Sequence, residues 1–131
     1  MASIKRFEEI ECWQLARELD KEVFGKTQKD NFSRDFKLRD QILGASGSIM
    51  DNIAEGFERN GNKEFIQHLS ISKGSSGELK SQLYRALDRE YIEQNEFDLL
   101  FGKADLISKK ISGFMNYLSK SGMKGDKYKN R

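Results

Sequence analysis

The chain has 131 residues, of which 34% are charged, with one cysteine and no proline. This length gives one domain with its own core, and the lack of proline favours long helices over a turn-rich β fold. No signal peptide follows Met1, no stretch approaches the roughly 20 apolar residues that span a bilayer, and one cysteine cannot form an internal disulfide, so we expect a cytoplasmic protein with no membrane partner.

Apolar residues at helical spacing predict four amphipathic helices, over residues 9–24, 36–58, 63–89 and 96–119. Joined by short connections, they predict an all-α fold, an antiparallel up-down-up-down four-helix bundle that forms a single domain over residues 1–119.

The segment between the first two helices, residues 25–35, reads as a polar connection anchored by Phe32. Gly25 is expected to end the first helix, since glycine is common just past a helix C-terminus. Ser33 or Asp35 is expected to cap the second, because their side-chain oxygens accept backbone N–H groups.

The two central helices form the predicted spine, folded at the turn Asn60–Asn62, where Asn62 is expected to cap the second of them. Residues whose numbers add to about 121 then lie level, including Gly44 with Gly77 and Gly47 with Gly74. A glycine inside a helix costs up to about 1 kcal/mol relative to alanine. Four at matching heights predict a close approach of the two backbones; the alternative is a gap that admits a ligand or a neighbour's side chain.

Polar residues form a row beside the apolar stripe of each central helix. We call them the polar seam: Ser48, Asn52, Glu55, Arg59, Ser75 and Glu78. One interpretation is a half-buried seam that fixes register within the bundle or between subunits. The other is an acid–base pair or a phosphate site. No nucleophile–base arrangement accompanies the row, so the sequence favours the seam and predicts no catalytic residue and no enzyme.

The net charge of +2 is uneven along the chain. Residues 120–131 hold five basic residues and one acidic residue, which leaves 18 basic and 20 acidic residues in the body. We expect this tail to be disordered and to contact phosphates, because clustered Lys and Arg bind them by releasing counterions. The candidate nucleic-acid-binding residues are Arg59, Lys63, Lys120, Lys124, Lys127, Lys129 and Arg131.

Neither a metal nor a cofactor is expected. A di-iron bundle needs Glu-x-x-His on two helices, whereas His68 is the only histidine and follows Glu64 by four residues. We interpret His68 as a surface or flank residue and Cys12 as a small core residue.

Several motifs together resemble one protein family. They are Trp13-Gln14-x-Ala16, Ser48-Ile49-x-x-Asn52-Ile53-Ala54-Glu55-Gly56 with Arg59, and Gly74-Ser75 with Glu78-Leu79. Over roughly residues 7–118 the chain resembles the 23S rRNA-intervening-sequence protein family, bacterial four-helix bundle proteins related to the accessory protein of diversity-generating retroelements.

This resemblance implies a ring-shaped homo-oligomer, a homopentamer, with no established enzymatic activity. It implies a non-enzymatic bundle that binds RNA or DNA electrostatically with little sequence preference; the alternative is a protein-interaction scaffold without a direct nucleic-acid role. The implied partners are the chain itself, RNA or DNA, and a reverse transcriptase or ribosomal component. If Phe7, Trp13 or Phe36 lies outside the core, apolar surface remains for a partner subunit to cover.

Overall fold

The computed structural model describes residues 3–121, which form one short 3-10 helix and five α-helices. The elements are η1 (Phe7–Glu9), α1 (Glu11–Thr27), α2 (Asp30–Arg34), α3 (Phe36–Glu58), α4 (Asn62–Asp88) and α5 (Gln94–Ser121). The prediction of an all-helical bundle is confirmed for this part of the chain. The predicted disorder of the tail concerns residues 122–131, which lie outside the described range, apart from residues 120 and 121 at the end of α5.

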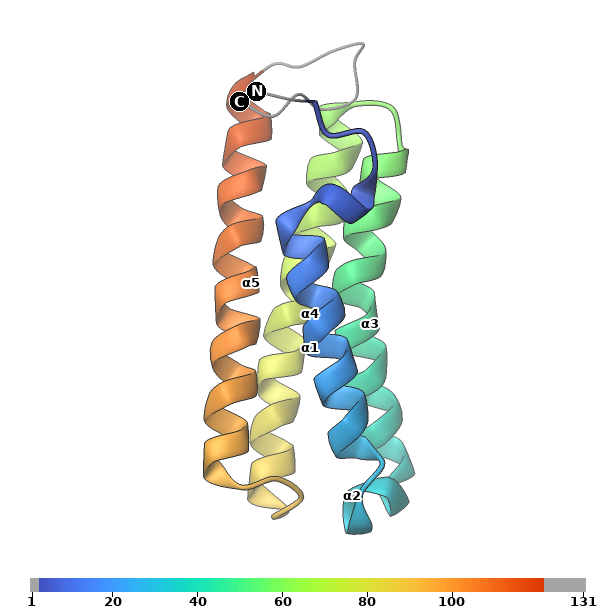
Figure 1. The fold of residues 1–131 in the computed structure, drawn as a ribbon, viewed down its shortest axis with the longest axis vertical. Helices are drawn as coiled ribbons and strands as arrows, with labels where there is room; N and C mark the ends of the chain where they lie inside the picture. The colour runs from blue at the N-terminus through green and yellow to red at the C-terminus, as the bar shows by residue number, and fades with distance from the viewer. Residues whose placement is uncertain (1–2, 122–131) are drawn as a thin grey trace.

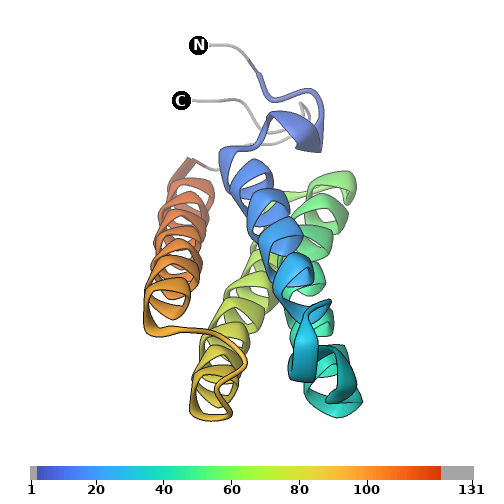
Figure 2. The ribbon, with the colours of Figure 1, turned by 60° about the horizontal axis from the view of Figure 1, so that its bottom comes forward.

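The four long helices lie side by side, with α4 between α3 and α5, and with α1 against both α3 and α5 (Figures 1 and 2). The start of α1, the α3–α4 turn and the end of α5 lie at one end of the bundle (Figure 1). A hydrogen bond joins two of these parts, since Asn62 Nδ2 donates to the carbonyl of Leu118 over 2.9 Å. The end of α1, the short α2 and the start of α3 lie at the opposite end.

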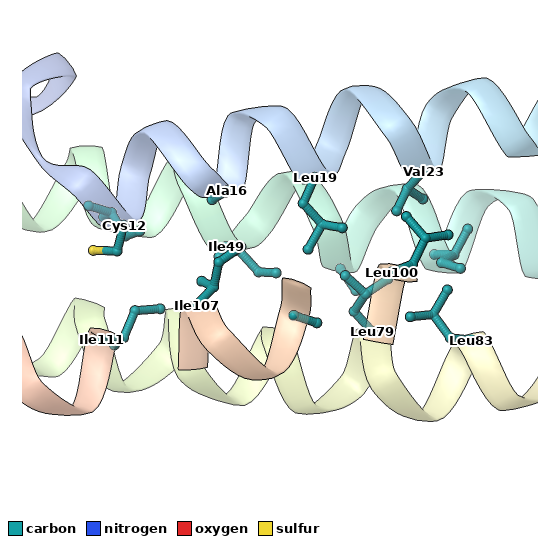
Figure 3. Packing of buried hydrophobic residues seen from close by; sticks show 14 of the residues in the cluster. Cys12, Ala16, Leu19, Val23, Ile49, Leu79, Leu83, Leu100, Ile107 and Ile111 are labelled. Carbon is teal, nitrogen blue, oxygen red and sulfur yellow. The ribbon is translucent and has the colours of Figure 1, made fainter. Parts of the chain in front are cut away.

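The core lies between the four long helices. Each contributes side chains at three- and four-residue steps, such as Cys12 and Leu19 of α1, Ile49 of α3, Leu79 of α4 and Ile107 of α5 (Figure 3). Removing these apolar surfaces from water is the main driving force for folding. Among residues 3–121 no helix has the length and apolar character needed to cross a membrane.

The predicted register of α3 and α4 is confirmed by hydrogen bonds between them. The Ser72 hydroxyl donates to the carbonyl of Ile49 over 2.6 Å, and the Ser75 hydroxyl donates to that of Ser48 over 2.8 Å. Further along, Gln82 Nε2 donates to the carbonyl of Gln41 over 3.2 Å. The two helices are therefore antiparallel, with the levels that the turn at Gly61 predicts.

The predicted role of the four glycines is wrong. A Cβ added to Gly44, Gly47, Gly74 or Gly77 would meet no heavy atom within 4 Å, so no close approach occurs there. The close approach is at Gly56, where an added Cβ would lie 2.7 Å from His68 Cβ and 2.8 Å from Phe65 Cδ1. Gly56 is buried in α3 and faces the start of α4.

Two predicted helix ends also need correction. Helix α1 continues past Gly25 to Thr27, and Thr27 is fully buried, with its hydroxyl donating to the carbonyl of Phe24. Asn62 is the first residue of α4 and does not cap it; Gly61 is at the cap position, with a φ of 137°. That φ explains the glycine, because side chains strain such a backbone.

The connection predicted as polar contains the short helix α2. Its Phe32 is buried, as expected, and its ring stacks on that of Tyr91 with centroids 5.0 Å apart. Of the two proposed caps, Asp35 caps α3, because its Oδ1 accepts the N–H of Leu38 over 3.1 Å.

Candidate functional site

Three of the polar-seam residues form a hydrogen-bonded chain across the α3–α4 contact. Asn52 Nδ2 donates to the carbonyl and the hydroxyl oxygen of Ser48, over 3.0 and 2.9 Å. Ser75 Oγ donates to the same Ser48 hydroxyl, and Asn52 Oδ1 lies 3.1 Å from His68 Nδ1. His68 thus joins the seam although the sequence interpretation left it at the surface; its side chain is only 17% exposed.

Glu55 and Arg59 form the charged part of the polar seam, one turn apart on α3. Arg59 donates to Glu55 Oε2 over 2.7 Å, and His68 Nε2 lies 3.9 Å from the same oxygen. The hydrogen bond from Arg59 holds the pKa of Glu55 below its ordinary value. Glu78 is exposed on α4, and within residues 3–121 no hydrogen bond or ion pair joins it to the other seam residues.

Three of the predicted nucleic-acid-binding residues come together at one end of the bundle. Arg59 and Lys63 flank the α3–α4 turn, and Lys120 is in the last turn of α5. All three are exposed, and the Asn62–Leu118 hydrogen bond holds the turn against α5. We call Arg59, Lys63 and Lys120 the basic end. The remaining candidates, Lys124, Lys127, Lys129 and Arg131, lie outside the described residues.

Comparison with known proteins identifies the family. Residues 8–113 match the family described as 23S rRNA-intervening sequence protein. The chain belongs to this family. The match covers most of the range, residues 7–118, over which the sequence motifs show the resemblance. No curated protein matches the chain.

A solved structure supports the same fold for this 23S rRNA-intervening sequence protein. The chain is similar to a crystal structure of a protein of unknown function from the S23 ribosomal protein family of Bacteroides thetaiotaomicron VPI-5482. The TM-score is 0.72 at 20% sequence identity, and the similarity covers 79% of this chain and 97% of the other. At this identity the likeness establishes the fold alone.

The polar seam in this family member is a hydrogen-bonded network across the α3–α4 contact. His68 contacts the amide oxygen of Asn52, and no hydroxyl or thiol lies within hydrogen-bond reach of it among the contacts of residues 3–121. A nucleophile held by a base is the minimum for covalent catalysis. In the same range no cluster of three or more His, Cys, Asp or Glu side chains could hold a metal ion.

Cys12, in the first turn of α1, is no better placed for chemistry. Burial raises the pKa of its thiol to about 12, so the reactive thiolate is scarce at neutral pH. It lines an open cleft of about 290 Å³ between the start of α1 and α5, together with Ile4, Ile10 and Phe114. The ammonium of Lys110 at this cleft pairs with a neighbouring carboxylate, that of Glu11, over 3.1 Å.

Two features of the surface were missed by reasoning from sequence. The contact of His68 with Asn52 could have been predicted from the sequence, because the register of α3 and α4 puts the two residues level. The second feature is a pair of exposed phenylalanines, Phe24 and Phe36, at 52% and 63% exposure. The sequence raises exposure as a possibility for Phe36 but not for Phe24, whose place at the end of a helix does not indicate exposure by spacing alone.

Proposed function

We propose that this protein is a non-enzymatic four-helix bundle of up-down-up-down topology, assembled into a ring-shaped homo-oligomer, a homopentamer, that binds RNA or DNA electrostatically with little sequence preference. The observation that carries the proposal is the basic end. Arg59 and Lys63 lie with Lys120 at the end of the bundle from which residues 122–131 continue. Four more basic residues and one acidic residue follow there in the sequence.

The charge distribution argues for binding through this end. The body has 18 basic and 20 acidic residues, so its net charge attracts no polyanion. A local cluster still can, because the Debye length at physiological salt is about 8 Å and distant acidic residues are screened. Phosphate contacts made by such a cluster bring affinity without sequence information.

Salt dependence tests the proposal directly. The protein is titrated into a labelled structured RNA at several salt concentrations, beside a variant in which Lys124, Lys127, Lys129 and Arg131 are glutamine. We expect log K to fall less steeply with log salt in this variant, with a slope smaller in magnitude by up to about 3.6, because each of the four lost phosphate contacts removes roughly 0.7 to 0.9. Lys73→Gln, on the exposed outer side of α4, is the matched control and should leave the slope almost unchanged. Absence of binding at low salt, or binding that salt does not weaken, would refute the proposal.

The assembly part of the proposal is supported by exposed aliphatic side chains on α5. Leu99 and Leu106 are 57% and 46% exposed and lie seven residues apart on one face. Lys103 between them pairs with Glu22 of α1, so the two leucines lie beside the α1–α5 junction. Large exposed apolar side chains on one face are typical of a protein–protein contact.

Light scattering on the purified chain measures the assembly. The wild-type protein is expected to have several times the mass of one chain, and Leu106→Asp is expected to lower it. Ile71→Asp, an exposed aliphatic residue on α4, is the control for a general effect of charge. A wild-type monomer would contradict the ring.

The alternative function, a protein-interaction scaffold, rests on the same two leucines. It predicts that a partner protein remains bound after nuclease treatment, and that Leu106→Asp releases it. Under the nucleic-acid proposal, nuclease treatment releases whatever is captured with the chain.

A further inference from the structure

The corner formed by α1, α2 and α3 exposes two aromatic rings. The side chain of Phe36 is 63% exposed and that of Phe24 is 52% exposed. Other exposed apolar residues differ from these two: Leu99 and Leu106 have no ring, and the Tyr84 ring packs on those of Phe97 and Phe101.

Phe24 and Phe36 lie at the same end of the bundle, near the end of α1 and at the start of α3. Asp20 Oδ1 accepts from Ser46 Oγ over 2.5 Å, which turns that side of α1 towards α3, and Phe24 follows Asp20 by one turn. Phe36 precedes Leu43 on α3 by two turns, and Leu43 packs partly buried against the core. Counted from the Asp20–Ser46 contact toward this end of the bundle, Phe24 is four residues further along α1 and Phe36 is ten residues back along α3. At a helical rise of 1.5 Å per residue the two residues lie roughly 9 Å apart along the bundle.

The segment of the chain that carries these rings is rich in basic residues. Between Lys21 and Asp40 the sequence has six Lys or Arg and four Asp or Glu, whereas the body as a whole has more acidic than basic residues. Three of the four carboxylates are held in ion pairs: Glu22 with Lys103, Asp35 with Arg89, and Asp40 with Arg39. The exposed basic residues are Lys21, Lys29, Arg34 and Lys37.

One basic side chain, that of Arg39, contacts the Phe36 ring directly. Its guanidinium carbon lies 4.8 Å from the centroid of the Phe36 ring, and its Nη1 donates to the carbonyl of Ser33 over 3.0 Å. The side chain is therefore fixed over one face of the ring, and it holds the ring in place. We call Phe24 and Phe36 with Lys21, Lys29, Arg34, Lys37 and Arg39 the aromatic corner.

We propose that the aromatic corner binds single-stranded RNA or DNA, with bases stacking on Phe24 and Phe36 and phosphates contacting the surrounding lysines and Arg34. Exposed rings beside basic side chains are the combination that single-strand-binding proteins use, and stacking tolerates any base. A duplex keeps its base faces covered, so the corner favours single strands. The inference rests on the proposed function and adds a second site, at the opposite end of the bundle from the basic end.

Fluorescence anisotropy with a labelled single strand of about 12 nucleotides tests the site, a length within the range of known single-strand sites. The measurement uses the full chain with the four tail residues changed to glutamine, so that tail binding does not mask the corner. We expect Phe36→Ala and Phe24→Ala each to weaken binding about 5- to 150-fold, the range for loss of one stacked base. Phe36→Trp should retain the affinity, and a duplex of equal length should bind more weakly.

Salt titration separates stacking from charge. Phe36→Ala should leave the slope of log K against log salt unchanged, whereas Lys37→Gln should reduce the magnitude of this negative slope by about 0.7. Ile71→Ala on α4 is the matched control for loss of an exposed apolar side chain, and it should bind like the parent protein. Because Phe24 and Phe36 are exposed, their alanine variants should unfold at the same urea concentration as the parent.

Three results would overturn the inference while the proposed function stands. One is single-strand affinity unchanged in Phe24→Ala and Phe36→Ala, and another is an equal loss in Phe36→Trp and Phe36→Ala. The third is a lower mass of Phe36→Ala in light scattering, which would assign the corner to a contact between copies of the chain. If the wild-type protein binds neither single strands nor structured RNA, the proposed function fails as well.

Discussion

The contact at Gly56 decides how closely α3 and α4 can pack, and we expect Gly56→Ala to destabilise the protein. The new methyl carbon would lie 2.7 Å from His68 Cβ, 2.8 Å from Phe65 Cδ1 and 3.3 Å from the carbonyl oxygen of Phe65. Neither side chain can give way at low cost. The position of a Cβ is fixed by its own backbone, and the Phe65 ring is fully buried, with another ring, that of Phe114, at 5.3 Å.

Two terms set the magnitude. Inserting a methyl group into a packed core costs about 1 to 3 kcal/mol, and the upper part of this range applies because the α4 backbone itself must move. Alanine recovers about 1 kcal/mol through its better helix propensity. The free energy of unfolding should therefore fall by about 2 kcal/mol.

Urea denaturation followed by circular dichroism measures this change, with Gly44→Ala as the matched control. Both substitutions improve helix propensity in α3, but a Cβ at Gly44 meets nothing within 4 Å. Gly44→Ala should therefore raise the free energy of unfolding by up to about 1 kcal/mol. If Gly56→Ala is as stable as Gly44→Ala, the close approach of the two helices at Gly56 is refuted.

Three further predictions concern ionisation and the polar seam. The hydrogen bond that Asp35 accepts from the N–H of Leu38 lowers the pKa of Asp35, so the carboxylate's stabilising effect is full above the unfolded pKa of about 4 and is lost as pH falls through the lower folded pKa. Asp35→Ala should therefore be less stable than wild type at pH 7 in urea titrations. An equal loss of stability at a pH below both pKa values would contradict this. Because burial raises the pKa of Cys12 to about 12, its reaction with a thiol reagent at pH 8 should be at least about 100-fold slower in the folded protein than in urea, and comparable rates would show the thiol to be accessible. Asn52→Ala removes the link between Ser48 and His68 and should lower the free energy of unfolding by about 1 to 3 kcal/mol. Its affinity for RNA in band shifts should be unchanged. Weaker RNA binding by a folded variant would give the seam a functional role.

The sequence predicted the register of the central helices because a single turn and a helical rise determine it. Once the chain folds at Gly61, Ser48 must lie near the level of Ser75, and the hydroxyl contact between them is observed. The same information placed Asn52 level with His68. The interpretation of His68 as a surface or flank residue missed its contact with Asn52, because it considered the residue's own helix and not the helix opposite.

The error over the glycines has a different physical origin. Height along a helix is only one coordinate, and the direction around its axis is the other. Gly44 follows the core residue Ile42 by two positions, which turns it about 200° away from the core at 100° per residue. Gly56 follows Ile53 by three positions and therefore faces inward, so the stripe itself identifies the glycine that matters.

Helix α2 and the aromatic corner could not be predicted from the spacing of apolar residues in the sequence. Five residues complete little more than one turn, too few to show a helical repeat, and such a short helix is stable only through tertiary contacts. Here those contacts are the buried Phe32 and its stacking on Tyr91, 59 positions further along the chain. Exposure of Phe24 and Phe36 likewise depends on which side of α1 meets α3, and that is a property of the folded pair.

The basic end and the aromatic corner lie at opposite ends of the bundle, and this separation has a consequence for longer strands. Helix α3 has 23 residues, so its ends are roughly 34 Å apart. A strand too short to span this distance can occupy one site at a time, and each site then binds with its own affinity. A strand that reaches both makes the second contact intramolecular, at an effective concentration that can reach the millimolar range.

Strand length therefore discriminates between one site and two. With the wild-type chain, Phe36→Ala should weaken binding of a long single strand by a larger factor than binding of a short one, because the long strand loses the gain from double attachment. Titrations with oligonucleotides of increasing length measure the ratio of wild-type to variant affinity directly. A ratio that stays the same at all lengths would mean that the two ends act on separate strands, and the bundle would then hold two molecules of nucleic acid apart instead of stretching one along its side.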